Sequence, residues 1–246
     1  MSESKLTAAD KTRITTAVNR FREVEYDFRH FAKTVHSLIS EHPLLAPVIH
    51  SVKWRVKNPT HLRRKLIGKA LRERQRKQPA KPITADNLFQ RIEDLAGVRI
   101  LHLHTRQMGT IHEALLRVLA DQQYVVKGPV ANTWDDESRR YFKSIGIKTM
   151  ARESMYTSVH YIVSPNSTSI IRCEIQVRTL SEELWGEVSH KIDYPTPTRS
   201  IACKEQLRVL ARISSGCTRS VDSIFESERE NTAWRQRLRT TKKRSK

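Results

Sequence analysis

The chain has 246 residues, a formal net charge of +19 and a hydrophobic content of 38%. This content suffices for a folded core, which excludes a disordered chain. No apolar run approaches the about 18 residues that a membrane-spanning helix needs, and the mean hydropathy is −0.58. Because the first residues, MSESKLTAADK, hold no apolar stretch that could act as a signal peptide, we expect a cytoplasmic protein.

The cysteines exclude two further classes of protein. Cys173, Cys203 and Cys217 are odd in number, show no CxxC spacing and have no cluster of histidines beside them. Neither a disulfide framework nor a zinc site is expected from this pattern, so the thiols are expected to be reduced and structural.

The positive charge is concentrated in two segments. Residues 51–81 contain twelve Lys or Arg against one acid, and residues 235–246 contain seven with none. Together they carry 18 of the 19 net charges, so the rest of the chain is close to neutral. The C-terminal segment has the composition of a frayed, solubilising end. For residues 51–81 we expect contacts with a phosphate-rich partner.

Apolar periodicity predicts one α+β unit. In residues 7–40 apolar side chains recur at three- and four-residue steps, which is typical of a helix that packs on a core. Residues 132–155 show no clear period, so we expect a mobile loop there. The predicted elements in chain order are a helix over 7–40, a basic helix over 61–77, a strand over 95–104, a helix over 110–121, a strand end over 124–130, strands over 156–163 and 172–179, and helices over 180–192 and 200–238.

These elements predict a mixed β-sheet of about five strands flanked by helices, with further helices at both ends. An N-terminal helical region is expected at residues 1–50, the core at 51–195, and a helical extension with a basic tail at 196–246. The core therefore includes the first of the two basic segments.

The run RCEIQVRT holds the clearest group of polar side chains within a predicted strand. Alternate side chains of a strand point to opposite faces, so Glu174, Gln176 and Arg178 share one face. Ile175 and Val177 are expected to pack on the other. An acid, an amide and a guanidinium thus project together from the sheet.

The helix that follows is expected to turn its apolar side to the core and its acids away from it. The expected apolar side consists of Leu180, Leu184, Trp185, Val188 and Ile192. Glu183, Glu187 and His190 are expected on the opposite side, with Glu182 in solvent.

The strand YTSVHYIV places Tyr156, Ser158 and His160 on one face. An aromatic ring beside a hydroxyl and an imidazole can hold a base and its phosphates. The simpler alternative is a sheet face that a helix covers.

Two acids at strands far apart in the sequence are the best candidates for a magnesium site. Asp94 precedes LAGVRI, and Glu174 lies in EIQVRT. Mg²⁺ prefers carboxylate and phosphate oxygens and needs few protein ligands, which suits phosphoryl transfer. The chain has no GxxxxGK[ST] loop, no kinase Gly-rich loop and no GxGxxG motif. Phosphate must then be held by Arg and Lys side chains, which residues 51–81 supply.

Four stretches in order resemble the synthetase domain of RelA/SpoT proteins, the alarmone synthetases. They are RVKNPTHLRRK (55–65), EDLAGVRI (93–100), YTSVHYIV (156–163) and EIQVRTLSEELWGEVSHKIDY (174–194). The resemblance implies a nucleotidyltransferase-like mixed sheet. It also implies transfer of pyrophosphate from ATP to the 3′ hydroxyl of GDP or GTP, which makes guanosine tetra- or pentaphosphate. Since no His-Asp dipeptide precedes the motifs, a stand-alone small synthetase is expected.

The resemblance further implies roles for residues on the ATP side. Arg55 and Lys57 match an RxK motif that grips the ATP phosphates, and Lys65 and Arg99 match further cations there. Asp94 matches a magnesium ligand.

On the acceptor side, Glu174 matches a metal-linked glutamate that is also the candidate base for the 3′ hydroxyl. Tyr156 matches a tyrosine that stacks on the acceptor base. His160 is expected near the acceptor phosphates, with Gln176 and Arg178 beside it.

Three departures from the family pattern bear on the acceptor and the ATP pocket. His61 stands where Ser is usual, and Ser189 stands where an acid is common, with Glu187 as its expected substitute. The segment RRYFKSIGIKTMARESMY replaces the family's acceptor loop and puts Met155 in place of a Gly. The alternatives are therefore an adenine nucleotide or the 3′ end of tRNA as acceptor, as in certain toxic relatives, or an inactive RNA-binding module. Relatives also suggest a homo-oligomer formed through residues 200–238.

Overall fold

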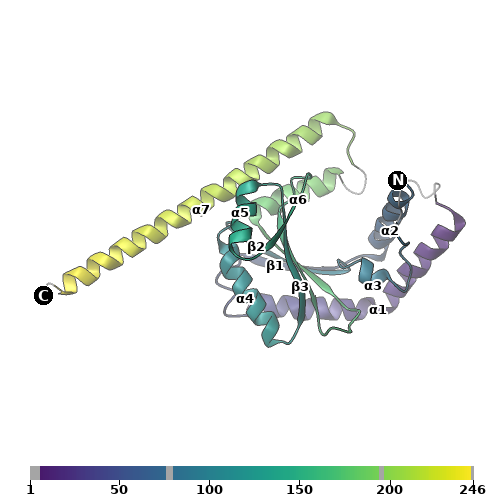
Figure 1. The fold of residues 1–246 in the computed structure, drawn as a ribbon, viewed down its shortest axis with the longest axis horizontal. Helices are drawn as coiled ribbons and strands as arrows, with labels where there is room; N and C mark the ends of the chain where they lie inside the picture. Colours follow the sequence, from purple (N-terminus) through teal and green to yellow (C-terminus); the bar gives the residue numbers. More distant parts are fainter. Residues whose placement is uncertain (1–5, 76–79, 194–196, 245–246) are drawn as a thin grey trace.

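The computed structural model describes residues 6–75, 80–193 and 197–244 (Figure 1). Its first element, α1, begins with a capping box in which Thr7 and Asp10 satisfy each other's backbone N–H groups. The elements are α1 Ala8–Glu41, β1 Ser51–Val56, α2 Pro59–Glu73, α3 Leu88–Arg91, β2 Ala96–His102, α4 Gln107–Asp121, β3 Val125–Thr133, α5 Asp136–Ser144, β4 Lys148–Ala151, β5 Ser158–Ser164, β6 Cys173–Thr179, α6 Leu180–Asp193 and α7 Ile201–Arg244.

Six strands form one sheet in the order β1-β2-β6-β5-β3-β4. β2 runs parallel to β6 and β3 runs parallel to β4, while the other neighbouring pairs are antiparallel. The predicted mixed sheet, flanked by helices and with helices at both ends, is confirmed, and its strand count is six where about five were expected.

The two faces of the sheet differ in chemistry because apolar and polar side chains alternate along the central strands. Val98, Ile100, Ile175 and Val177 are buried on one face, which packs against α1, while α4 packs against β3. In Figure 1 α1 lies along one side of the sheet and α6 and α7 lie along the other. The charged side chains of β2 and β6 therefore point towards the side that α6 partly covers.

The expectation of a mobile loop over residues 132–155 is wrong. The end of β3, the helix α5 and the strand β4 fill most of this segment. α5 is only nine residues long and buries Phe142 alone, so it shows no repeating apolar stripe. Its local signal is the cap, in which Asp135 accepts the Ser138 N–H at 3.0 Å.

Two other boundaries differ from the predictions. β1 was missed, although Val52, Trp54 and Val56 alternate with charged side chains, because the basic composition obscured its period of two. α2 begins at Pro59, where the Asn58 side chain caps the helix, and it ends at Glu73. The expected last residues of that helix, 76 and 77, lie outside the described residues.

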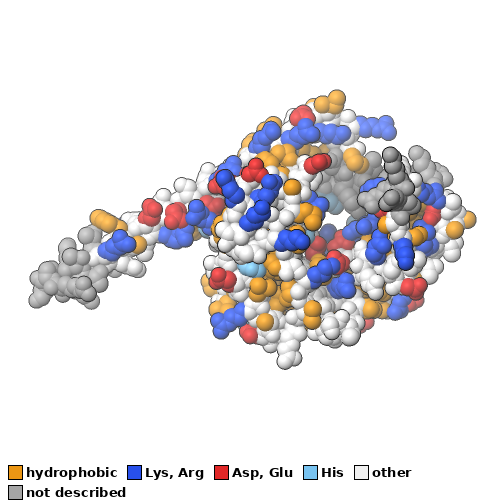
Figure 2. All heavy atoms as spheres, viewed as in Figure 1, with side chains coloured by type: hydrophobic (Ala, Val, Ile, Leu, Met, Phe, Trp, Pro, Cys, Tyr) orange, Lys and Arg blue, Asp and Glu red, His pale blue; other side chains and the backbone are white. Residues whose placement is uncertain are grey.

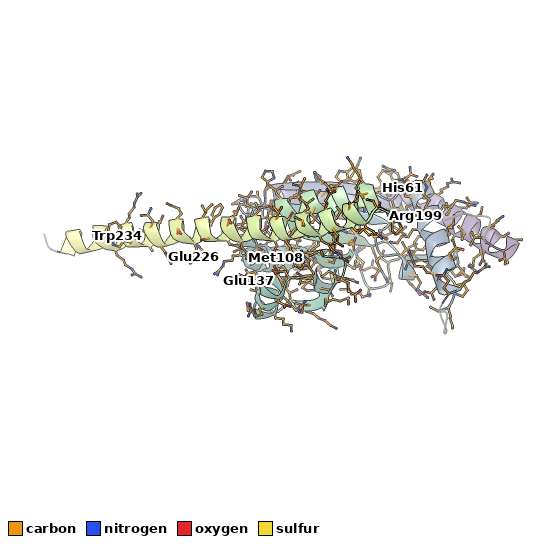
Figure 3. The ribbon with its side chains drawn as sticks, turned by 90° about the horizontal axis from the view of Figure 1, so that it is seen from above. His61, Met108, Glu137, Arg199, Glu226 and Trp234 are labelled. Atoms are coloured by element: carbon orange, nitrogen blue, oxygen red, sulfur yellow. The ribbon has the colours of Figure 1, made fainter. Side chains whose placement is uncertain are left out.

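α7 packs on α6 and then runs beyond the sheet, so that Trp234 lies well away from the body (Figure 3). One carboxylate fixes where α7 leaves the body: Asp222 accepts hydrogen bonds from His104 at 2.6 Å and from the Arg106 N–H at 2.9 Å. Phe225 stacks on the His104 ring, with 4.5 Å between the centroids. None of the described helices combines the length and the apolar content that a membrane span requires.

Candidate active site

A cavity of about 250 Å³ lies on the charged face of β1, β2 and β6. The sheet register sets Arg55 opposite Gly97 and Gly97 opposite Glu174. Gly97 has no side chain, so the middle of this row stays open between a cation and an acid. Figure 2 shows basic and acidic side chains around a hollow in the rounded body of the protein. The cavity is lined by Lys53, Trp54, Arg55, Asp94, Gly97, Val98, Arg99, Glu174, Gln176 and Glu187.

Asp94 lies just before β2 and is held by two lysines. Lys57 Nζ lies 2.9 Å from its carboxylate, and Lys65 Nζ donates to both oxygens at 2.6 Å. Lys57 follows β1 and Lys65 lies on α2, so the carboxylate joins three segments. Burial acts to raise the pKa of Asp94, but the charges and hydrogen bonds of the two lysines lower it to about 2. Asp94 is therefore an anion that already has cations beside it.

Glu174 is held by a different set of partners. His160 Nδ1 lies 2.8 Å from one of its oxygens, and Gln176 Nε2 donates to the other at 2.7 Å. The Tyr156 hydroxyl lies 3.1 Å from His160 Nε2 and completes a chain of three side chains. Burial raises the pKa of Glu174, the hydrogen bond and charge of His160 lower it, and the net direction is down. The charge of Asp94 acts to raise this pKa, so the two carboxylates lie within electrostatic reach of each other.

Arg178 and Arg99 are bound by acids of α6. Arg178 is only 4% exposed and pairs with Glu183. Arg99 donates to Glu183 at 2.9 Å and to Glu187 at 2.8 Å. The predicted outward position of Glu183 is wrong, because two guanidinium groups beneath the helix attract it inward. Leu184, expected on the apolar side, is 58% exposed instead.

The start of α6 corrects a second expectation. Glu182 is not solvated: its carboxylate accepts the Thr179 N–H at 2.9 Å, and its own N–H donates to the Thr179 hydroxyl at 3.3 Å. This is a capping box, which the sequence TLSE signals. Burial raises the pKa of Glu182 to about 7.

The structure brings most of the predicted site residues into one neighbourhood. Arg55, Asp94, Arg99, Glu174 and Gln176 line the cavity. The other predicted residues contact them: Lys57 and Lys65 contact Asp94, His160 contacts Glu174, and Tyr156 contacts His160. Arg178 shares the face but lies beneath α6, so its contact with an acceptor stays a prediction.

Sequence reasoning missed Lys53 and Trp54, which also line the cavity. Both lie on β1, and recognition of the alternation in SVKWRV as a strand would have placed Lys53 on the same face as Arg55.

The donor set fits a cation that arrives with a nucleotide. Within the described residues no three His, Cys, Asp or Glu side chains converge on a metal-binding centre. Asp94 and Glu174 supply carboxylate oxygens in one cavity, and Mg²⁺ commonly takes its remaining ligands from substrate phosphates and water. Asp94 and Glu174 would hold the Mg²⁺ ion.

A family model for the region found in RelA/SpoT proteins matches residues 54–199. The chain belongs to the RelA/SpoT family. No curated protein sequence matches it.

Solved structures agree with this RelA/SpoT assignment at the level of the fold. The structure of small alarmone synthetase 1 from Bacillus subtilis superposes with a TM-score of 0.57 at 20% identity, covering 87% of this chain and 96% of that one. The structure of the same protein bound to AMPCPP gives 0.57 at 18% identity, covering 82% and 95%. The structure bound to its product pppGpp gives 0.55 at 20% identity, covering 84% and 93%.

One departure from the RelA/SpoT pattern lies at a residue with an unusual backbone conformation. Met155, which replaces a Gly before Tyr156, has φ of 59°. This left-handed region favours glycine, and an L-residue there costs roughly 1–2 kcal/mol. This position therefore has a backbone conformation that glycine would adopt without that cost.

Gly186 on α6 is the residue that lets the helix lie on Arg178, which gives a test of this packing. A Cβ at position 186 would overlap the Arg178 guanidinium, which Glu183 holds in place. Overpacking costs about 1–3 kcal/mol, while alanine gains at most about 1 kcal/mol over glycine in a helix. We expect Gly186→Ala to lower the free energy of unfolding, measured by urea denaturation.

Gly216→Ala on α7 is the matched control, because a Cβ there meets no atom within 4 Å. It should leave stability unchanged or raise it. Equal stability of both variants would contradict the packing of α6 on Arg178.

Proposed function

We propose that this protein transfers the terminal diphosphate of ATP to the 3′ hydroxyl of GDP or GTP. The observation that carries the proposal is that Asp94 and Glu174 share one cavity but have different partners. Lysines surround Asp94, as the phosphates of a donor require, whereas an imidazole and a tyrosine adjoin Glu174. The fold of a synthetase whose structures hold AMPCPP and pppGpp supports this assignment.

The proposed reaction is a displacement at the β-phosphorus of ATP. The 3′ oxygen of the acceptor forms a bond to this phosphorus, the bond from the phosphorus to the oxygen bridging the α-phosphate breaks, and AMP leaves with that oxygen. Glu174 takes the hydroxyl proton. Such a transfer depends on in-line positioning and charge neutralisation more than on covalent catalysis. In this proposal Lys57, Lys65 and Arg55 hold the phosphates.

Two features assist this chemistry. Mg²⁺, held by Asp94 and Glu174, would neutralise phosphate charge. Stacking of the acceptor base on Tyr156 would contribute about 1–3 kcal/mol without strong choice among bases. The choice of acceptor must therefore come from contacts around Tyr156 and the segment before it.

A tRNA 3′ end is the second candidate acceptor. α2 adjoins the site through Lys65 and displays further cations such as Arg64 and Arg72. Excess positive charge strengthens binding to any polyanion. A transfer assay with both kinds of acceptor distinguishes between them.

The acceptor assay uses ATP with labelled β- and γ-phosphates, incubated with GDP, GTP, ADP or deacylated tRNA. We expect label on GDP or GTP. Label on tRNA alone would replace the proposed acceptor, and label on none would contradict transferase activity.

Glu174→Gln should lower the transfer rate on the order of 100- to 10,000-fold, the range for loss of a general base. The amide keeps the size of the side chain but cannot accept the proton. Glu113→Gln, on the exposed surface of α4, is the control and should retain full activity. Near-normal turnover of Glu174→Gln would remove Glu174 from the reaction.

We also propose that α7 joins copies of the chain. Ile224 and Trp234 are 66% and 60% exposed on this helix. Sedimentation should give a mass of at least two chains of 28.6 kDa each. Trp234→Glu should lower this mass. A wild-type monomer at micromolar concentration would contradict this arrangement.

A further inference from the structure

A second cavity, of about 200 Å³, shares no lining residue with the candidate active site. It lies between the first turns of α1, the C-terminal half of α2 and residues 80–83, with Arg91 of α3 at its edge. Nothing in the proposed transfer reaction uses it.

The acids of this second cavity are engaged in holding its walls together. Asp10 on α1 accepts from Arg13 at 2.6 Å and also pairs with Arg74 of α2. Glu73 accepts the Ala80 N–H at 2.9 Å and so fixes the start of residues 80–83. These contacts join α1, α2 and residues 80–83. Because Asp10 and Glu73 are engaged in them, the other cations of the cavity do not pair with these two acids.

Three cations remain: Lys69, Lys81 and Arg91. Within the part of the chain that the structure describes, Lys69 makes no hydrogen bond or ion pair. Arg91 donates to the backbone oxygen of Lys81 at 3.3 Å. Burial lowers the pKa of Lys69, the charges of Lys65, Arg91 and Arg72 lower it further, and the charge of Asp94 offsets this only in part. A half-buried ammonium among cations is unfavourable unless an anion joins it.

The other walls set the size and the strength of the site. Ile14, Leu66, Ala70 and Ile83 form an apolar lining beside the cations. Such a lining strengthens an ionic contact because it lowers the local dielectric constant. A volume of about 200 Å³ is sufficient for a phosphate or diphosphate group.

We propose that this second cavity binds a small phosphate anion, of the size of phosphate or diphosphate, through Lys69, Arg91 and Lys81. Either free pyrophosphate or the terminal phosphates of a nucleotide would present this group. Lys69 lies one helical turn after Lys65, which holds Asp94, so the anion would sit close to the active site without entering it.

Calorimetric titration of the full-length protein with inorganic pyrophosphate tests the proposal. We expect two sites, because the active site also holds phosphates. Lys69→Met should weaken one of them by at least about tenfold, as expected for loss of a charged hydrogen bond. Arg55→Gln should weaken binding at the active site and leave binding in the second cavity intact. A single site that Arg55→Gln abolishes and Lys69→Met leaves intact, or two sites that both survive in Lys69→Met, would overturn the proposal. A single site that only Lys69→Met abolishes would support it and would instead contradict phosphate binding at the active site.

Two additions sharpen the titration. Arg64→Gln removes one positive charge from α2 but lines neither cavity, so it should leave both sites unchanged. A fall in Arg64→Gln equal to that in Lys69→Met would show general charge attraction and overturn the site. Titration of Arg55→Gln with ADP as well as pyrophosphate distinguishes the two sources of the phosphate group, since tighter binding of ADP identifies a nucleotide.

Thermal unfolding separates binding from packing. Without anion, Lys69→Met should melt at a higher temperature than the wild type, because it removes an unpaired cation from a half-buried position. In the Arg55→Gln background, pyrophosphate should raise the melting temperature only when Lys69 is present. A ligand-free Lys69→Met protein that melts lower, with no loss of pyrophosphate binding, would assign Lys69 to packing alone.

Discussion

The parallel pairing of β2 with β6 is the contact on which the candidate active site depends. Its register sets Gly97 beside Glu174 and Arg99 beside Gln176. A shift by one residue would turn these side chains towards α1 and would expose Val98 and Ile175. The buried apolar face therefore fixes the register, and the register in turn fixes which charges meet. Asp94 reaches the cavity because it lies directly before β2.

Most charged side chains on this face of the sheet form ion pairs with other side chains of the chain. Asp94 binds Lys57 and Lys65, and Glu183 binds Arg99 and Arg178. Isolated charges are costly to bury, so these pairs make the face compatible with a folded core. The consequence for function is competition: nucleotide phosphates must draw Lys57 and Lys65 partly away from Asp94. Arg178, which is only 4% exposed, pairs with Glu183 and lies against Gly186, so it also supports the packing of α6.

The sequence could predict much of this arrangement because strand alternation is a local property. The period of two in CEIQVRT is sufficient to put Glu174 and Gln176 on one face, and the family motifs identify Asp94. The position of Glu183 could not be read in this way. Its inward turn depends on Arg99 and Arg178, which lie on two strands and meet only after the sheet has formed.

Short elements were the harder part of the prediction. α5 and β4 bury few side chains, so tertiary packing and a single cap determine them more than periodicity does. β1 alternates clearly, but its exposed positions are basic, so its sequence resembles the rest of the charged segment 51–81 more than a strand. The cavity around Lys69 was beyond prediction, since α1, α2 and residues 80–83 form it together.

Binding of Mn²⁺, measured by electron paramagnetic resonance with a non-hydrolysable ATP analogue present, tests the central claim most directly. The claim is that Asp94 and Glu174 act together on one metal–nucleotide complex. It predicts that the wild-type protein holds Mn²⁺ more tightly when the analogue is bound, and that Asp94→Asn and Glu174→Gln each weaken this binding. Equal Mn²⁺ affinity in the wild type and both variants would contradict the claim.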